Sequence, residues 1–261
     1  MKCELYNDNF QNFKRYNIPK AQLVVADIPY NVGTNFYGSN PSWYIGGDLK
    51  NGESKLANKA AFHTDFNFNI VEYFHFCNRL LKKEPEKSNG RGKSSDAPCM
   101  IVFCAFQQIP FLIDTAKSYG FKHSIPLTFI KNYSPQVLKA NMRVCGATEH
   151  AVLLYREKLP KFRNNGKMVF DWMPWEHDGK DIPKIHPTQK PIKLLERLIT
   201  TFTDSGDVVI DPVAGSGATL RAAQNTGRNA FGFEISKVFY RAAQEKMLNM
   251  QEQQISMTEV I

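Results

Sequence analysis

The sequence predicts an α/β fold in which a mostly parallel sheet carries helices on both of its faces. Strand-like and helix-like segments alternate along most of the 261 residues, which is typical of sheets built from strand–helix–strand units. The run LVVA at residues 23–26 is apolar without alternation, as expected of a strand buried on both faces. Residues 68–83 instead place their apolar side chains at helical spacing, which predicts a helix packed on the sheet.

The other elements follow the same alternation. Strands are expected at residues 3–7, 21–28, 99–106, 124–130, 149–157, 207–212 and 229–235. Helices are expected at residues 68–83, 108–120, 191–202, 217–227 and 236–250. A charged, low-complexity linker spans residues 82–98. We expect one domain over residues 1–250 and a frayed polar tail over residues 251–261.

Composition and charge limit the function only weakly. The formal net charge of +8 fits a polyanionic partner, although many basic proteins bind no nucleic acid. Five cysteines without a CxxC pair, and six histidines without ligand spacing, indicate reduced thiols and no metal site. Neither a secretory signal nor an apolar run of membrane-spanning length is visible. These features predict a protein of the cytoplasm that has no membrane partner.

The strand at residues 21–28 leads into an unusual group of residues. Asp27, Ile28, Pro29 and Tyr30 stand at its carboxyl end, which is where open α/β sheets bind their ligands. A carboxylate, a rigid proline and an aromatic ring at this place suggest a site for a flat, polar molecule. The structural alternatives are a turn residue at position 27 and an aromatic ring that covers the sheet edge at position 30.

A second candidate site lies near the carboxyl terminus. The segment VVIDPVAGSGATL at residues 208–220 reads as strand, Asp-Pro, glycine loop and helix, and Glu234 follows Asp211 by 23 positions. An acidic side chain about 20 residues beyond a glycine loop suits the hydroxyls of a ribose. No GxxxxGK[ST] motif is present, and Asp211 would repel a pyrophosphate but tolerate a cation such as a sulfonium. The alternative is an ordinary tight turn with an exposed glutamate.

Three motifs together resemble one enzyme family. DIPY at residues 27–30, HPTQKPIKLLERLI at 186–199 and DPVAGSGAT at 211–219 resemble signatures of the DNA amino-methyltransferases that depend on S-adenosylmethionine (SAM). The catalytic motif precedes the cofactor loop, an order similar to that of the permuted β-class of these enzymes. The resemblance implies a Rossmann-like methyltransferase fold with circularly permuted motifs. Ile28 departs from the family pattern, which has proline there.

The resemblance also assigns roles to individual residues. It implies that Asp27, Ile28, Pro29 and Tyr30 form the catalytic motif. It places at the cofactor Asp8, Asp27, His186, Thr188, Lys190, Asp211, Pro212, Ala214, Gly215, Ser216, Gly217, Thr219 and Glu234. It places on the DNA side Lys131, Asn132, Lys139, Asn141 and Arg143.

The implied reaction is transfer of a methyl group from SAM to the 6-amino group of adenine in DNA. The 4-amino group of cytosine, adenine in RNA, and a non-catalytic nucleic-acid-binding subunit of the same fold remain alternatives. The target base must be flipped out of a duplex or already single-stranded. A homodimer, a cognate restriction endonuclease, and a location at the nucleoid of a prokaryote or in a phage-infected host are further expectations from the resemblance.

Substrate contacts are expected from segments that leave the carboxyl edge of the sheet. These segments are residues 31–67, 131–148 and 158–187, and the last two are rich in lysine and arginine. The stretch DWMPWEHD at residues 171–178 contains two of the three tryptophans, and it is expected either to recognise DNA or to pack a dimer.

Overall fold

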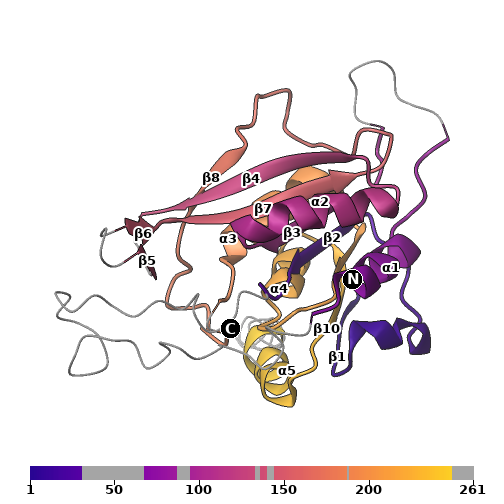
Figure 1. The fold of residues 1–261 in the computed structure, drawn as a ribbon. Coiled ribbons are helices and arrows are strands. Elements are labelled where there is room, and N and C mark those ends of the chain that lie inside the picture. The colour runs from indigo at the N-terminus through magenta and orange to yellow at the C-terminus, as the bar shows by residue number, and fades with distance from the viewer. Residues whose placement is uncertain (31–67, 87–94, 133–135, 140–143, 187, 249–261) are drawn as a thin grey trace, which may run out of the picture.

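A single eight-stranded sheet forms the centre of the computed structural model (Figure 1). The structure describes residues 1–30, 68–86, 95–132, 136–139, 144–186 and 188–248. In spatial order the strands are β1 (Cys3–Tyr6), β10 (Asn229–Phe233), β9 (Val208–Asp211), β2 (Leu23–Asp27), β3 (Cys99–Cys104), β7 (Thr148–Tyr155), β4 (His123–Lys131) and β8 (Trp172–Trp175). A separate hairpin pairs β5 (Gln136–Lys139) with β6 (Val144–Gly146).

The sheet is mostly parallel, as the sequence predicted. The first five strands in spatial order are parallel, β7 is antiparallel to both of its neighbours, and β8 is parallel to β4. Within this sheet, β7 is therefore the one strand whose direction is reversed. All the other strands end at the same edge, which we call the carboxyl edge.

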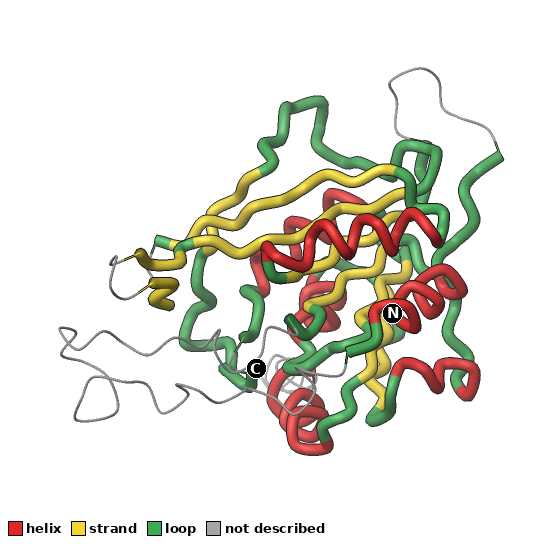
Figure 2. The backbone as a smooth tube through the Cα atoms, viewed as in Figure 1, coloured by secondary structure: helices red, strands yellow, loops and turns green. Residues whose placement is uncertain are grey.

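Helices cover both faces of the sheet, which confirms the predicted architecture (Figure 2). On one face α1 (Ile70–Leu80) and α2 (Ile109–Ser118) pack on a core that includes alternate residues of β2 and β3, such as Val24 and Val102. On the other face α3 (Ile192–Phe202) and α4 (Ala218–Asn225) pack on a core that includes Val25 and Ile101. The period of two along a strand explains how consecutive residues supply both cores.

The predicted helices and strands all form, with ends that differ by a few residues. The last helix has two parts, α5 (Lys237–Ala242) and a π-helical continuation, η6 (Ala243–Leu248). Two short 3-10 helices, η1 (Phe10–Arg15) and η4 (Phe106–Gln108), were not predicted, and neither were β5, β6 and β8. The tail at residues 251–261 and residues 87–94 of the linker lie outside the described residues.

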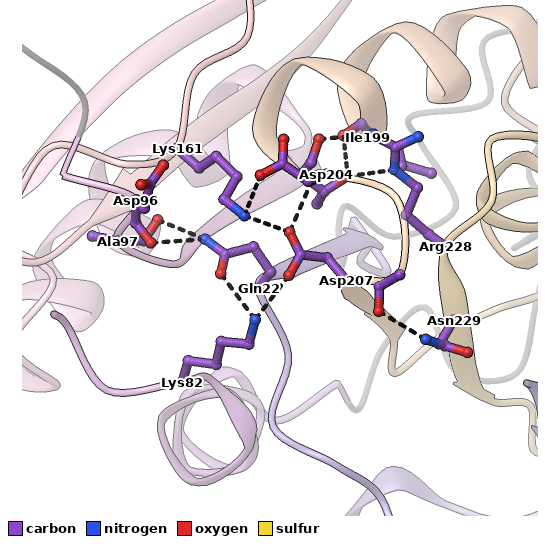
Figure 3. A network of polar contacts seen from close by, with 12 residues as sticks. Gln22, Lys82, Asp96, Ala97, Lys161, Ile199, Asp204, Asp207, Arg228 and Asn229 are labelled. Carbon is purple, nitrogen blue, oxygen red and sulfur yellow. Dashed lines mark hydrogen bonds and ion pairs between the residues drawn. The ribbon is translucent and has the colours of Figure 1, made fainter. Parts of the chain in front are cut away.

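One prediction about the segment 158–187 is wrong. Because β7 is reversed, its last residue, Tyr155, lies at the opposite edge of the sheet, and the chain does not return to the carboxyl edge until β8 ends at Trp175. Lys161 is buried at that opposite edge, where its ammonium lies 2.8 Å from Asp204 and 2.7 Å from Asp207 (Figure 3). Arg163 also pairs with Asp204. An apolar run does not reveal the direction of its strand, so the predicted edge is wrong for the first half of this segment.

Candidate active site

Three carboxylates stand at the carboxyl ends of neighbouring strands. Asp27 ends β2, Asp211 ends β9, and Glu234 directly follows β10. The strand register places these ends side by side, because β9 pairs with β2 on one side and with β10 on the other. The two motifs that the sequence assigned to catalysis and to the cofactor therefore meet at one place.

Lys190 binds the carboxylate of Asp27 directly. Its Nζ lies 2.5 Å from Asp27 Oδ2, and only 6% of the lysine side chain is exposed. Burial alone would lower the pKa of Lys190, but the carboxylates of Asp27, Glu149 and Asp211 outweigh it and the pKa is raised. Lys190 is thus a buried cation whose ammonium also lies 5.3 Å from the Phe103 ring centroid. The resemblance assigned this lysine to the cofactor, and the structure places it on Asp27, a residue that the resemblance assigned to both catalysis and the cofactor.

Glu149 is a second centre of polar contacts. The Tyr30 hydroxyl donates to Glu149 Oε2 at 2.8 Å, and Lys131 Nζ donates to Oε1 at 2.5 Å. Burial would raise the pKa of Glu149, but the ammonium groups of Lys190 and Lys131 lower it, so the carboxyl is ionised. Burial, with the charges of Asp27 and Glu149, raises the pKa of Tyr30 and keeps its hydroxyl protonated.

Lys131, which the resemblance places on the DNA side, has its side chain engaged within the site. Its side chain is 9% exposed, and its ammonium lies 4.9 Å from the centroid of the Trp175 ring as well as on Glu149. Trp175, at the end of β8, is itself buried, whereas Trp172 at the start of that strand is 46% exposed. The tryptophan-containing stretch therefore contributes one ring to the wall of the site.

Contacts with the backbone hold the DIPY motif against β3. The Ile28 amide donates to the Phe103 carbonyl at 3.2 Å, and the Ile28 side chain is buried in the core on the α1–α2 face. Gln108 Nε2 donates to the Pro29 carbonyl at 3.0 Å, while Gln108 Oε1 accepts from the Ala105 amide. An apolar residue at position 28 thus supplies a buried anchor for the motif.

The glycine loop follows the predicted geometry. Gly215 and Gly217 have φ angles of +52° and +77°, a region that favours glycine. Glu234 accepts from the Gly215 amide at 2.9 Å and from the Ser236 amide at 2.6 Å. Asp211 accepts from the Val213 amide at 3.0 Å, so the loop is held between two carboxylates.

Burial raises the pKa of both of these acids. The buried position of Asp211 raises its pKa to about 7; the charges of Asp27 and Glu234 add to this rise, and hydrogen bonds with Thr219 and Val213 oppose it. Burial also raises the pKa of Glu234. The edge therefore carries more acid than the nearby cations neutralise, and additional negative charge on it is unfavourable.

The HPTQK segment links the glycine loop to Asp27. A Cβ on Gly215 would lie 3.6 Å from the His186 ring, which also packs edge-on against Phe239 with 4.5 Å between the centroids. Burial and the charge of Lys190 lower the pKa of His186 to about 4, so the ring is neutral near pH 7. Thr188 Oγ1 lies 3.1 Å from His186 Nδ1, and Lys190 reaches Asp27 two residues later.

The remaining predicted residues fall into three groups. Pro212, Ala214, Ser216 and Thr219 lie in or just after the glycine loop, and the Ala214 amide donates to Phe233. Asp8 follows β1 and accepts from Asn12 at 2.7 Å and from Tyr16 at 2.8 Å. Asn132 is exposed; the side chain of Lys139 and residues 31–67, Asn141 and Arg143 lie outside the described part.

Sequence reasoning did not assign roles to Glu149, Trp175 and Gln108. Glu149 could have been recognised as a candidate site residue, because it adjoins an apolar strand run. It precedes the apolar run of β7, just as Asp27 follows the apolar run of β2. Trp175 and Gln108 gave no such signal, because their roles depend on the reversed strand and on a side chain that folds back to Pro29.

The chemistry of this edge suits a nucleoside without phosphates. Carboxylates can accept hydrogen bonds from ribose hydroxyls and attract a cationic group, but they repel phosphate oxygens. Across the described ranges, no cluster of three or more histidine, cysteine, aspartate or glutamate side chains is suited to a metal ion. No helix of those ranges has the length and apolarity needed to cross a bilayer.

The chain matches one family model and is similar in sequence to known proteins. The N6_N4_Mtase family model, described as DNA methylase, matches residues 21–245. The chain is 27% identical over 255 residues to the DNA adenine methyltransferase YhdJ of Escherichia coli (strain K12), which covers 92% of this chain and 80% of that protein. It is 37% identical over 259 residues to the Type II methyltransferase M2.DpnII of Streptococcus pneumoniae. This alignment covers 93% of this chain and 88% of that protein.

The fold also has a close counterpart among solved structures. The crystal structure of the M1.HpyAVI–SAM complex superimposes with a TM-score of 0.64 at 22% identity, over 94% of this chain and 98% of that one. The Rossmann-like methyltransferase fold implied by the motifs is therefore confirmed. With a family match over most of its length, the chain belongs to the N6_N4_Mtase family of DNA methylases.

Proposed function

We propose that the protein transfers a methyl group from SAM to the 6-amino group of adenine in DNA. The observation that carries this proposal is the meeting of Asp27 and Tyr30 with the glycine loop at one sheet edge, joined by Lys190. When bound, SAM supplies an electrophilic methyl group on a positively charged sulfur. The acid-rich edge, with its glycine loop and neutral His186, fits such a cation.

On the cofactor side, the residues of this chain bind and orient. Glu234 is already fixed by two backbone amides, and each of its oxygens can accept a further hydrogen bond from a ribose hydroxyl. Asp211 supplies negative charge near the sulfonium. Gly215 and Gly217 let the backbone approach the ligand closely. Asp8 is proposed to act near the adenine ring through the loop that it organises.

On the substrate side, Asp27 and the Ile28 carbonyl accept hydrogen bonds from the target amine. The lone pair of an exocyclic amine is delocalised into the ring, so two acceptors favour a more pyramidal and more nucleophilic nitrogen. They also stabilise the positive charge that develops on nitrogen during attack. Lys190 fixes the orientation of the carboxylate through Oδ2. The amine proton leaves after methyl transfer, so Asp27 need not be a strong base.

Tyr30 supplies a stacking surface for the flipped base. Its hydroxyl is fixed by Glu149, which limits rotation of the ring before substrate binds. Stacking of a base on an aromatic side chain contributes about 1–3 kcal/mol. Adenine is favoured over cytosine by the aspartate at position 27 and by the adenine-specific name of the relative YhdJ.

DNA is the macromolecular substrate of this family. Which segments of this chain contact the DNA, and with which partners the protein acts, are proposals. We propose that the DNA backbone and bases are contacted at the carboxyl edge by residues 131–148 and by residues 176–187, which follow β8. Residues 31–67 are proposed to contact DNA as well. Homodimerisation, a cognate restriction endonuclease, and a nucleoid or phage-infected setting rest on the family resemblance alone.

The product of the reaction tests the proposal. Purified protein is incubated with SAM and unmethylated genomic DNA, and the nucleosides are analysed by mass spectrometry. We expect 6-methyladenine with the wild type and none with Asp27→Asn, which keeps the shape of the side chain but removes its charge. Appearance of 4-methylcytosine would overturn the base assignment. Methylation of RNA in place of DNA, or SAM binding without turnover, would overturn the proposed activity.

A further inference from the structure

A largely exposed aromatic side chain stands beside the catalytic motif. Phe106 begins η4, two residues beyond the end of β3, and 67% of its surface is exposed. Its ring packs against His150 of β7 with 5.5 Å between the centroids. We propose that Phe106, supported by His150, stacks on a DNA base that neighbours the flipped adenine. This inference rests on the proposed function and adds a substrate contact to it.

Two sets of contacts fix this aromatic pair to the catalytic motif. Gln108 lies two residues after Phe106 in the same 3-10 turn, and its side chain donates to the Pro29 carbonyl. His150 directly follows Glu149, which accepts from the Tyr30 hydroxyl. Phe106 and His150 are therefore held at defined positions relative to residues 27–30. An exposed phenylalanine by itself would not indicate a binding site, because single exposed apolar residues are common.

The pair lies on the opposite side of the sheet edge from the pocket around Asp27. Alternate residues of β7 face opposite sides, and Val152 belongs to the core under α1 and α2, whereas Ala151 belongs to the core under α3 and α4. By this alternation Glu149 faces the pocket and His150 faces the other side. Phe106 therefore cannot stack on the base that Tyr30 holds. Under the proposal, it instead meets the duplex from which that base has left.

The chemistry of the pair suits a base more than a phosphate. Burial lowers the pKa of His150, an effect that Glu149 only partly opposes, so the imidazole is neutral near pH 7. A neutral ring behind a phenylalanine offers a flat apolar surface and no charge for a phosphate. Flipping a base removes stacking from its neighbours. Other DNA-binding proteins insert apolar side chains between base steps, so contact between such a side chain and an unstacked base is favourable.

Phe111 provides a matched control for exposure. It lies on α2, five residues further along the chain, and is 60% exposed. If exposed phenylalanines matter only for solubility or nonspecific contact, Phe106→Ala and Phe111→Ala should behave alike. If position beside the catalytic motif matters, only the first should affect methylation.

The test compares two duplexes that contain a site methylated by the wild type. One is fully paired, and the other has an abasic position opposite the target adenine, which lowers the cost of flipping. We expect Phe106→Ala to lower kcat/KM on the paired duplex by about 10-fold, within the range of one lost stacking contact. On the abasic duplex we expect Phe106→Ala to lower kcat/KM by about threefold or less, which is at least threefold less than on the paired duplex. Phe106→Trp should retain activity on both, and the KM for SAM should not change.

The outcomes separate the possible failures. Wild-type activity of Phe106→Ala on the paired duplex overturns the inference, and so does an equal loss with Phe111→Ala. An equal loss on both duplexes, or no rescue by tryptophan, indicates a structural role and also overturns it. A wild type that forms no 6-methyladenine in DNA instead overturns the proposed function on which the inference rests.

Discussion

Replacing Lys190 with methionine should impair the chemical step and leave cofactor binding largely intact. Methionine has a similar length but no charge, so Asp27 Oδ2 loses the ammonium that lies 2.5 Å away. Removing one partner of a buried ion pair costs about 3–5 kcal/mol. The Asp27 side chain is 25% exposed and can gain some hydration, which places the expected loss of folding stability nearer to about 2–3 kcal/mol. Separately, an Asp27 carboxylate that is no longer held in one orientation stabilises the developing charge less well, and we expect kcat to fall on the order of 100-fold.

The activity of Lys190→Met should depend on pH in a way that the activity of the wild type does not. Lys190 has a raised pKa because of the Asp27, Glu149 and Asp211 charges, and this coupling is mutual: the ammonium favours the ionised form of Asp27. Without it, Asp27 faces two other acids and binds a proton at a higher pH than in the wild type. The activity of Lys190→Met should therefore recover as the pH rises, whereas that of the wild type changes less over the same range.

The assay is steady-state methylation with the KM for SAM and kcat measured separately across about pH 6 to 9. Lys193→Met is the control, because Lys193 is an exposed lysine three residues further along the chain. Lys190→Arg, which keeps the charge, should retain more activity than Lys190→Met at every pH. A raised KM for SAM with unchanged kcat would refute the reasoning and restore the cofactor role that the sequence suggested for Lys190.

Three further predictions follow from the same contacts. Tyr30→Phe removes one hydrogen bond to Glu149, worth about 1 kcal/mol, and should lower kcat/KM less than tenfold. Glu149→Gln also removes the charge that faces two lysines, so it should lower kcat/KM by more in the same assay. The pKa of Asp211 is about 7 in the folded state and ordinarily 3.8, so folding stability is lost as the pH rises from 3.8 to 7. Asp211→Asn should therefore raise the midpoint of denaturant unfolding above pH 7, and it should weaken SAM binding. An unchanged midpoint would count against a buried charge at this position. Gly232→Ala would place a Cβ 2.7 Å from Leu220 Cδ1, so we expect a loss of about 1–3 kcal/mol in the free energy of unfolding, and a stability equal to the wild type in denaturant would contradict this packing.

The sequence allowed the fold and the two motifs to be predicted because both depend on local signals. Buried strands such as β2 and β3 are continuous apolar runs, and α3 shows its apolar face at helical spacing. The Asp-Pro-glycine turn after β9 also identifies itself by residue type. These features do not require knowledge of how distant segments pair.

The parts that could not be predicted depend on strand direction and on long-range contacts. EHAVLLYRE reads as a strand equally well in either direction, so the sequence did not show that Tyr155 lies away from the site. A strand of four residues that contains Pro174 is too short to recognise by its pattern, although it brings Trp175 to the site. The contact between Lys190 and Asp27 joins residues 163 positions apart.

The basic residues show why net charge is a poor guide to the DNA-binding surface. Lys131 and Lys190 hold carboxylates inside the site, and Lys161 and Arg163 bind Asp204 at the opposite edge. Charges engaged in this way are largely neutralised, so they add little to the long-range field that attracts a phosphate backbone. The overall charge of +8 must therefore act through other lysines and arginines. A DNA contact in this protein should be sought among exposed basic residues at the carboxyl edge, and the number of lysines in a segment does not identify them.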